Sequence, residues 1–557
     1  MNQISNSEAE ALVRSAFTDA NIAISDVQIR DYPDESIILV RVNEDYITKA
    51  IDIANSLDKV LTTREFDGFV TVKKANKSEL EAKPGRMENL LDARVTEFSN
   101  LLVSRSRTSE VQPSLKYIRD ANSHLDAVIS SRHHLIFGRR GSGKTALLAE
   151  VRNRCHSDED FTVWLNSQTH RHEPIDRFFL TICLRICEVV HVATRKSRLT
   201  DRLSTLANNL ASDVEVLLRN ELPLHTRVVS LIPRVQEVVR RLTTESGKRL
   251  LVFLDDLHYL PRSDQPMLLD MVHGTVRDCD AWLKIATIQH LTQWYDSSRH
   301  IGLQTGHDAS HVDLDLSLQN PQEAKHFLEA LLNSYAEHCD LRSVAKIFAQ
   351  RGAMDRLVIA SGAVPRDYLM LCSSAIQIAR QRPNAKSVGV QDINVAAGAT
   401  KQKKIDELED DAASSTGESA FAIATLKQVQ KFCLEKTSFT FFRVDFSDKD
   451  ASPEIYARLQ LLLDLRLVHM IEASLSDERI AGRKSEVFLL DLSQFAGSRL
   501  KRKLSVLDLH DGNLVLKQTG SKTAPRIGTT ANKKLSILRR APLLTLEKEL
   551  SSSPQEK

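Results

Sequence analysis

Apolar and polar positions change their spacing several times along the chain, and each change marks a candidate domain boundary. Between residues 7 and 75, helical spacing and strand-like alternation follow each other, which predicts a small α+β domain over residues 1–76. Residues 77–112 combine polar stretches with one apolar helical stretch, so we expect a linker that contains a helix. Neither segment carries a pattern that assigns it a function.

From residue 113 onward, short apolar runs alternate with longer helical patterns. Five strands are expected, at residues 134–137, 161–165, 250–254, 283–288 and 312–316. Apolar strands that alternate with helices are typical of a parallel sheet covered by helices on both faces. We therefore expect an α/β core over residues 113–320.

Helical periodicity alone continues beyond Pro321, which predicts a helical unit over residues 321–400. The charged and Ser-containing residues 401–419 are expected to form a linker or the solvated end of a helix. Residues 420–497 show two helices followed by two strands around a polar loop, which is the outline of a winged helix. Residues 498–557 are basic with sparse apolar clusters, so we expect a partly disordered tail.

Composition places the chain among ordinary globular proteins, because 42% of its 557 residues are hydrophobic and 27% are charged. The N-terminus does not resemble a leader, and no apolar run approaches about 18 residues, so we expect a cytoplasmic protein without membrane contact. None of the seven cysteines forms a CxxC pair. Cys183 and Cys187 share a helical face, but their apolar neighbours favour a buried core over a metal site.

Positive charge is concentrated near the C-terminus. The net charge is only +2, yet residues 499–540 hold eleven basic and two acidic side chains. This asymmetry suggests an acidic partner, with duplex DNA as the first candidate and a merely solvated tail as the alternative. The residues expected to contact phosphates are Arg479, Arg483, Lys484, Arg499, Lys501, Arg502 and Lys503.

The clearest chemical motif follows the first strand of the core and opens a helix. It consists of Gly138, Arg139, Arg140, Gly141, Ser142, Gly143, Lys144 and Thr145. Glycines without Cβ atoms let backbone N–H groups wrap a triphosphate at the helix N-terminus. Lys144 is expected to reach the β and γ phosphates, and the Thr145 hydroxyl to bind magnesium. The motif predicts ATP and Mg²⁺ as cofactors; a flexible glycine turn would not explain Lys144 and Thr145.

A second motif follows the third strand, where five apolar residues lead directly into Asp255 and Asp256. A buried strand that delivers a carboxylate to the magnesium shell is typical of such ATPases, and Asp255 is the metal-side candidate. Asp256 is expected to orient or deprotonate the attacking water. The alternative for Asp256 is an acidic cap of the following helix.

The order of these motifs resembles the AAA+ ATPases of the origin-recognition type and the related STAND signalling ATPases, over roughly residues 113–400. The resemblance implies a γ-phosphate sensor at the end of the fourth strand, which is Gln289 or else Thr287. It also implies a second sensor in the lid, Arg366, and an arginine finger acting on a neighbouring subunit, Arg299. For both arginines a solvated surface position is the alternative.

The chain departs from this family in two respects. Asp256 stands where the AAA+ class more often has glutamate, and residues 196–245 are expected to be an inserted helical element. The fold class expected is α/β, with a P-loop parallel-sheet ATPase core, a helical lid, a small N-terminal α+β domain and a C-terminal winged helix.

Two function classes follow. In the first, ATP controls assembly on DNA through the winged helix and the basic tail. In the second, which resembles STAND proteins, the winged helix packs on the ATPase and the chain is a signalling or phage-defence switch for a protein partner. Both classes imply a homo-oligomer or a protein partner. Glu454 and Asp464 on the expected recognition helix count against DNA, and no further nucleophile or metal cluster favours metabolic catalysis.

Overall fold

In the computed structural model the chain forms two compact units, residues 1–87 and residues 88–557, which we treat separately. The structure describes residues 5–20, 22, 24–31, 36–42, 46–63, 66, 68–74, 90–106, 117–119, 123–157, 160–196, 199–219, 224–341, 343–349, 351–383, 385–412, 418–497, 500, 503–521 and 523–550. Over these ranges, none of the helices has both the length and the apolar character that crossing a bilayer requires.

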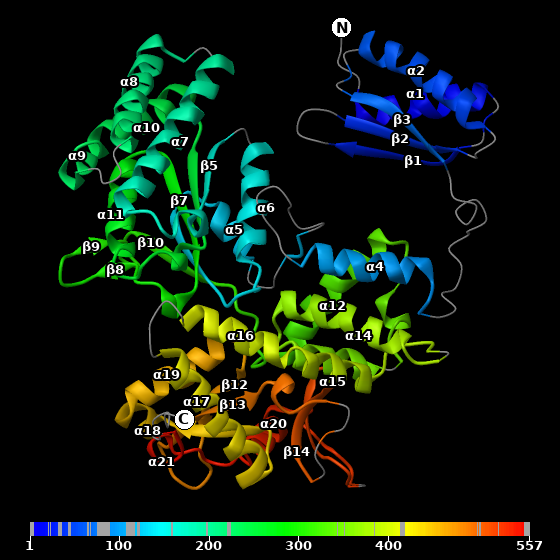
Figure 1. The fold of residues 1–557 in the computed structure, drawn as a ribbon, viewed down its shortest axis with the longest axis vertical. Coiled ribbons are helices and arrows are strands. Elements are labelled where there is room, and N and C mark those ends of the chain that lie inside the picture. Colours follow the sequence, from blue (N-terminus) through cyan, green and yellow to red (C-terminus); the bar gives the residue numbers. More distant parts are fainter. Residues whose placement is uncertain are drawn as a thin grey trace. The chain divides into compact units, whose positions relative to one another are not determined.

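The N-terminal unit is a three-stranded sheet with two helices (Figure 1). Its elements are α1 (Asn6–Asp19), β1 (Ile24–Asp31), β2 (Ser36–Val42), α2 (Ile47–Thr63) and β3 (Gly68–Lys74). Strand β2 pairs antiparallel with β1 and parallel with β3. One face of β2 is buried in a core with residues of both helices, and it consists of the alternate residues Ile38, Val40 and Val42. This burial explains the strand-like alternation in the sequence. The α+β prediction for this segment is confirmed.

The second unit contains the predicted parallel sheet. Its strands are β4 (His133–Phe137), β5 (Phe161–Asn166), β6 (Leu250–Asp255), β7 (Ala281–Thr287) and β10 (Ala309–Asp313). They are hydrogen-bonded in the order β10-β4-β7-β6-β5, and every neighbouring pair is parallel. The carboxyl ends of all five strands therefore meet at one edge of the sheet, and β7 lies between the strands that carry the two motifs.

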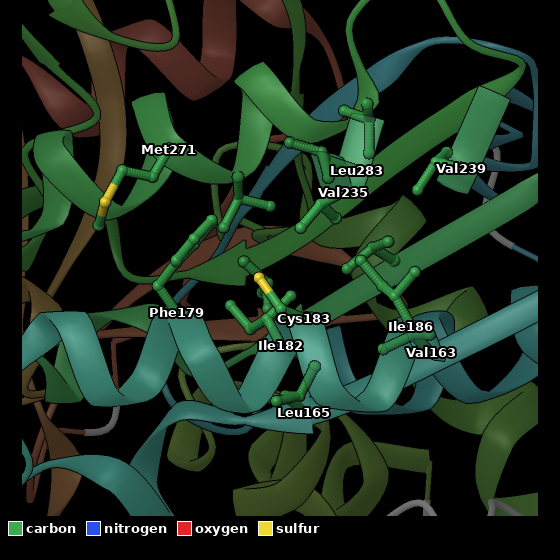
Figure 2. Packing of buried hydrophobic residues seen from close by; sticks show 14 of the residues in the cluster. Val163, Leu165, Phe179, Ile182, Cys183, Ile186, Val235, Val239, Met271 and Leu283 are labelled. Carbon is green, nitrogen blue, oxygen red and sulfur yellow. The ribbon is translucent and has the colours of Figure 1, made fainter. Parts of the chain in front are cut away.

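An inserted set of helices packs on one face of this sheet. The helices are α7 (Ile175–Lys196), α8 (Asp201–Leu218), α9 (His225–Val229), α10 (Ile232–Ser246) and, after β6, α11 (Gln265–Val276). Figure 2 shows Phe179, Ile182 and Cys183 of α7 facing Val235 of α10 and Leu283 of β7. Residues 201–218, 225–229 and 232–246 are thus helical, as predicted for residues 196–245, and Cys183 lies in the buried core, as predicted; burial raises the pKa of its thiol well above the ordinary value.

The lid follows the sheet as four helices, α12 (Pro321–His338), α13 (Arg351–Ala360), α14 (Pro365–Arg380) and α15 (Val390–Ala399). Within the segment expected to be a linker, α4 (Ala93–Ser104) is packed against α14 and α12 (Figure 1). Residues 401–412 form the helix α16 (Lys401–Ala412), so the helical alternative holds for this part of the segment.

The next elements are consistent with a winged-helix-like domain. They are α17 (Glu418–Lys431), β11 (Phe441–Asp445), α18 (Phe446–Ala451), α19 (Pro453–Asp464), β12 (Val468–Ser476) and β13 (Lys484–Leu490). The sheet has the order β11-β13-β12, and β12 and β13 form the hairpin that encloses the wing. The predicted helices and hairpin are present; β11 and α18 were not predicted.

The prediction of a partly disordered tail is wrong for residues 503–521 and 523–550. These residues form β14 (Ser505–His510), β15 (Asn513–Gln518), β16 (Arg526–Ile527), α20 (Ala531–Leu538) and α21 (Leu546–Leu550). Leu544, Leu546 and Leu550 are fully buried in the winged-helix core, and the Leu544 amide donates to the carbonyl of Arg443 on β11. The physical reason is burial: the apolar positions, although sparse, fill one existing core. Of the predicted phosphate contacts, Arg499, Lys501 and Arg502 lie outside the described residues.

Candidate nucleotide site

The loop between β4 and α6 (Lys144–Ser157) has the backbone that its glycines predict. Gly141 and Gly143 have φ angles of 84° and 103°, a region that residues with a side chain rarely adopt. A Cβ atom on Gly141 would also lie 2.7 Å from the Cβ atom of Arg366 in the lid. Glycine at this position is therefore required both by the loop conformation and by the approach of the lid.

Lys144 is the buried cation of the loop, with 7% of its surface exposed. Its Nζ donates to the carbonyl oxygens of Gly138 (2.8 Å) and Arg139 (3.2 Å). Burial lowers the pKa of Lys144, and the carboxylates of Asp256, Asp315 and Asp255 oppose that shift. The ammonium is thus held at the phosphate loop beside the acidic groups that follow β6.

Asp255 ends β6 beside the first turn of α6. The Thr145 hydroxyl donates to Oδ2 of Asp255 at 2.9 Å, while Oδ1 is buried and has no hydrogen-bond partner within the described part of the chain. Burial and the neighbouring Asp256 carboxylate raise the pKa of Asp255. A hydroxyl next to a carboxylate with an unused oxygen is a set of hard oxygen donors that fits Mg²⁺. A bound Mg²⁺ would be held by Thr145 and Asp255 and would neutralise phosphate charge.

Asp256 has a φ of 57°, so the chain turns sharply directly after the buried strand. It occupies the cap position of the short turn Leu257–Tyr259, but its side chain makes no capping hydrogen bond. Burial raises the pKa of Asp256, whereas the nearby cations Lys144, Arg140 and Arg366 lower it. The carboxylate therefore lines the cavity near three positive charges, and no capping hydrogen bond supports the alternative of a helix cap.

The lid places Arg366 at the cavity that the phosphate loop and the two aspartates line. Pro365 opens α14, and the backbone amide of Arg366 donates to the carbonyl of Gly141 at 3.3 Å. Arg366 lines the cavity together with residues 140–145 and both aspartates. Of the residues predicted from the family resemblance alone, it is the one that the structure brings to the phosphate loop.

Gly138 and Arg139 were predicted to bind the nucleotide, but neither lines the cavity. A Cβ atom on Gly138 would lie 2.4 Å from the Ser142 hydroxyl, so this glycine lets the loop close on itself. The Arg139 guanidinium is buried and points to the lid, where it donates to the carbonyls of Leu316 (2.9 Å) and Gly362 (3.4 Å). Arg139 therefore connects the phosphate loop to the segment after β10 and to the lid turn at Gly362 by hydrogen bonds.

The predicted γ-phosphate sensor is also away from the cavity. Strand β7 ends at Thr287, and Gln289 lies on the exposed turn that follows. Thr287 is buried, and its hydroxyl is 2.5 Å from that of Thr292. Neither residue lines the cavity, because the chain turns away from the sheet edge at this point.

Arg299, the predicted finger, lies on the hairpin of β8 (Tyr295–Asp296) and β9 (Ile301–Gly302), away from the cavity. Its Nε donates to Asp296 Oδ2 at 2.7 Å, and 53% of its side chain is exposed. Such a position leaves the guanidinium accessible to another copy of the chain.

The cavity around these residues has a volume of about 820 Å³, which is in the range of small-molecule sites. Two parts of its lining were not predicted. Asn166 ends β5 in register with Asp255, and it could have been found because it follows an apolar strand as Asp255 does. The apolar part of the lining carries no sequence signal distinct from core residues: Tyr117, Ile118, Leu314, Phe327, Leu331 and Leu369.

Comparison with known proteins identifies the central part of this unit. The family model described as the AAA ATPase domain matches residues 117–280, which confirms the predicted AAA+ resemblance for that segment. No curated protein matches the chain.

Several solved structures are similar to the chain at low identity. The Orc1 protein of Aeropyrum pernix, in complex with DNA, is 15% identical, with 74% of this chain and 92% of that chain covered and a TM-score of 0.30. Cdc6p of Pyrobaculum aerophilum is 13% identical, with 68% and 93% covered and a TM-score of 0.33. A STAND protein with a tetratricopeptide repeat sensor from Pyrococcus horikoshii is 12% identical, with 69% and 43% covered and a TM-score of 0.28. Likeness at this level does not bear on function.

Proposed function

We propose that this chain, whose residues 117–280 match the AAA ATPase domain, binds and hydrolyses Mg-ATP as a molecular switch. In this proposal the nucleotide state changes the contacts that the winged-helix-like domain makes with the lid. Support for the chemistry comes from the cavity. Lys144 lies at the phosphate loop, Thr145 and Asp255 offer oxygens to Mg²⁺, and Asp256 faces the cavity where water would attack. Arg366 adds a cation from the lid.

One observation carries the proposal of a switch: the winged-helix-like domain contacts the lid turn that the phosphate loop also contacts. Arg139 of the loop donates to the carbonyl of Gly362, and the Gly362 Cα packs against the ring of His469 on β12. Five residues after Gly362, Asp367 accepts a hydrogen bond from the Arg466 guanidinium at 2.7 Å, directly beside Arg366. A movement of the loop or of Arg366 on nucleotide binding must therefore alter the surface on which β12 rests.

A third contact reaches the end of β7. His290 Nδ1 lies 2.6 Å from Oδ2 of Asp464, the last residue of α19. The His469 Nε2 lies 2.8 Å from Oδ2 of Asp491, and the Lys404 Nζ of α16 lies 2.9 Å from the same oxygen. Although burial opposes it, Lys404 and His469 hold the pKa of Asp491 well below its usual range. The contact region is thus a buried charged network, which favours two discrete arrangements over gradual sliding.

Nucleotide binding is tested by titrating a fluorescent ATP analogue into the full chain and into the Lys144→Ala variant. The wild type is expected to bind in the presence of Mg²⁺, and the variant to bind at least about 100-fold more weakly, because a buried charge-assisted contact to phosphate is lost. Lys248→Ala removes a lysine from the same sheet domain away from the cavity and is the matched control. Equal affinity of the wild type and Lys144→Ala would reject the assignment of this site.

Binding to duplex DNA is a second candidate function, and the exposed cations of the wing, the loop between β12 and β13, support it. Arg479 and Lys484 are exposed and form no ion pair with any residue that the structure describes. Arg483, the third predicted contact, donates from Nε to Asp445 at 2.7 Å, so part of its charge is already neutralised. The wing therefore offers two cations to a phosphate backbone.

The expected recognition helix, α19, supports DNA binding less well than the wing does. The exposed residues of its first turns include Glu454 and Ala457, and its last residue, Asp464, is engaged by His290. An acidic side chain on the reading face opposes DNA, and the contact at the helix end restricts access to it. These features favour the switch that acts on a protein partner over the DNA-assembled machine.

The two candidates are separated by anisotropy of labelled duplex DNA with the full chain at about 50 mM salt, where nonspecific binding is strong. If the wing binds DNA, the double variant Arg479→Ala/Lys484→Ala should reduce the slope of log affinity on log salt by about 2. The double variant Lys49→Ala/Lys59→Ala removes two exposed cations from the N-terminal unit as a control. An absence of binding by the wild type, or equal slopes for all three proteins, would exclude the wing as a DNA site.

A further inference from the structure

Helix α4 lies outside the matched ATPase domain, yet it is packed tightly on the lid (Figure 1). Its buried face holds Val95, Phe98 and Leu102, none of them exposed. Ser99 and Ser373 of α14, both buried, have their hydroxyl oxygens 2.8 Å apart, and the Ser373 hydroxyl also reaches the carbonyl of Ser99 at 3.1 Å. Small residues on both helices thus allow a close approach that hydrogen bonds then fix.

A second set of contacts holds the start of the segment. Arg380 near the end of α14 donates from Nε to the carbonyl of Leu90 (2.8 Å) and from a terminal nitrogen to the Thr96 hydroxyl (2.9 Å). Together with the two serines, Arg380 ties α4 to α14 on successive turns. The position of α4 is therefore set by the lid.

The C-terminal end of α4 reaches the nucleotide cavity. Arg105, the residue that caps α4, and Ser106 both line it. Burial raises the pKa of the Tyr335 hydroxyl, and the nearby Arg105 guanidinium opposes that shift. Tyr335 follows Phe327 and Leu331 at helical spacing on α12, and these three residues line the cavity as well. Arg105 is consequently at the lid end of the cavity.

A nucleotide whose phosphates lie at residues 141–145 and whose metal lies at Asp255 would place its nucleoside in the remaining part of the cavity, whose lining includes Arg105, Phe327 and Tyr335. We propose that Arg105 and Ser106 bind the nucleoside part of ATP there, so that α4 forms a wall of the nucleotide site. The proposal rests on the proposed ATP binding. A guanidinium provides a planar face and several N–H donors for a purine ring or ribose, and the Ser106 hydroxyl adds a donor and an acceptor.

The test uses two probes on the full chain: a fluorescent ATP analogue, and inorganic tripolyphosphate as its competitor. Arg105→Ala is expected to weaken ATP and ADP alike by about tenfold, because a charge-assisted contact to the nucleoside is lost. Its affinity for tripolyphosphate should stay unchanged, since that probe has no nucleoside. Arg94→Ala is the control, because Arg94 lies on the same helix, is paired with Asp92 and does not line the cavity.

A second variant tests the helix instead of the arginine. Ser99→Leu inserts bulk between α4 and α14, and should weaken ATP while leaving tripolyphosphate binding unchanged; Ser99→Ala should bind like the wild type. Circular dichroism shows whether each variant is folded.

Unchanged ATP affinity of both Arg105→Ala and Ser99→Leu would overturn the inference while leaving ATP binding intact. Loss of tripolyphosphate binding in Arg105→Ala would overturn it too, because Arg105 would then act on phosphates. If the wild type itself fails to bind the ATP analogue, the proposed function fails, which is a different result from either of these.

Discussion

Gly362 is the residue at which the lid turn, the phosphate loop and the winged-helix-like domain come together, so its replacement by alanine is a severe test of the switch. Its φ is 59°. A Cβ atom there would lie 2.0 Å from Cε1, 2.3 Å from Nδ1 and 2.7 Å from Nε2 of His469. Contacts this short cannot be tolerated, so the ring or the whole of β12 must move away from the lid.

The cost of Gly362→Ala has two parts. A left-handed backbone costs an L-residue about 1 to 2 kcal/mol. The His469 ring cannot rotate away freely because it is buried and hydrogen-bonded to Asp491, which also contacts Lys404. Loss of one buried hydrogen bond to a charged acceptor costs about 1.5 to 3 kcal/mol. The substitution should therefore cost about 2.5 to 5 kcal/mol in total.

Amide hydrogen exchange of β12 is the suitable assay, because it measures local opening in a multidomain chain that is not expected to unfold in two states. Gly247→Ala is the matched control: Gly247 has a similar φ of 67°, but no atom lies within 4 Å of the Cβ position. Gly247→Ala should reduce local stability only by the backbone cost of about 1 to 2 kcal/mol, and only in the turn around residue 247. If Gly362→Ala leaves exchange of β12 as in the wild type, the contact does not couple the domains.

Three further outcomes are expected. Asp256→Asn should keep ATP affinity and lose at least about 100-fold in turnover, measured as phosphate release, because only the group that orients water is neutralised; unchanged turnover would assign that role elsewhere. Arg299→Ala should lower turnover only at protein concentrations where copies assemble, with recovery on mixing with Lys144→Ala, and an unchanged rate at high concentration would reject a finger. Burial lowers the pKa of His133 to about 4 and of His134 to about 3. At these two positions the unfolded chain therefore binds more protons than the folded chain below pH 6.5, so their contribution to stability falls as the pH is lowered toward 5; a His133→Gln/His134→Gln variant whose melting temperature has the same pH dependence as that of the wild type would contradict this.

The sheet and the phosphate end of the site were predictable because their signals are local. Each central strand is a short apolar run, and the residues that matter chemically stand at or directly after its end, as Asp255 is the last residue of β6. The glycines of the loop are fixed by backbone angles within a few residues. Local periodicity and local geometry are therefore enough to place Lys144 beside Asp255.

The tail shows where composition misled the interpretation. Residues 504–516 hold apolar residues on both sides of Asp511-Gly512, a dipeptide that is a hairpin signal, and this stretch lies in β14 and β15. The basic charge hid this signal, yet several of the cations are paired within the fold: Lys517 with Asp508, and Lys534 with Glu472. Net charge reports the surface of a domain and does not decide whether it folds.

The rest of the site depends on contacts between distant segments. The lid end of the cavity is built from α4, Tyr117, α12 and α14, and the lid turn meets His469 more than a hundred residues further along the chain. An apolar or charged residue in such a place has the same local pattern as any core or surface residue. Only the folded structure brings these segments together.

The central claim, that the winged-helix-like domain reads the nucleotide, is tested most directly by amide hydrogen exchange of residues 466–476 with and without a nonhydrolysable Mg-ATP analogue. We predict that saturating nucleotide changes exchange in this segment of the wild type, because the loop and lid contacts on which β12 rests are rearranged. The Lys144→Ala variant should show no change under the same conditions. Identical exchange in the wild type with and without nucleotide, at concentrations where binding is shown to be complete, would contradict the claim.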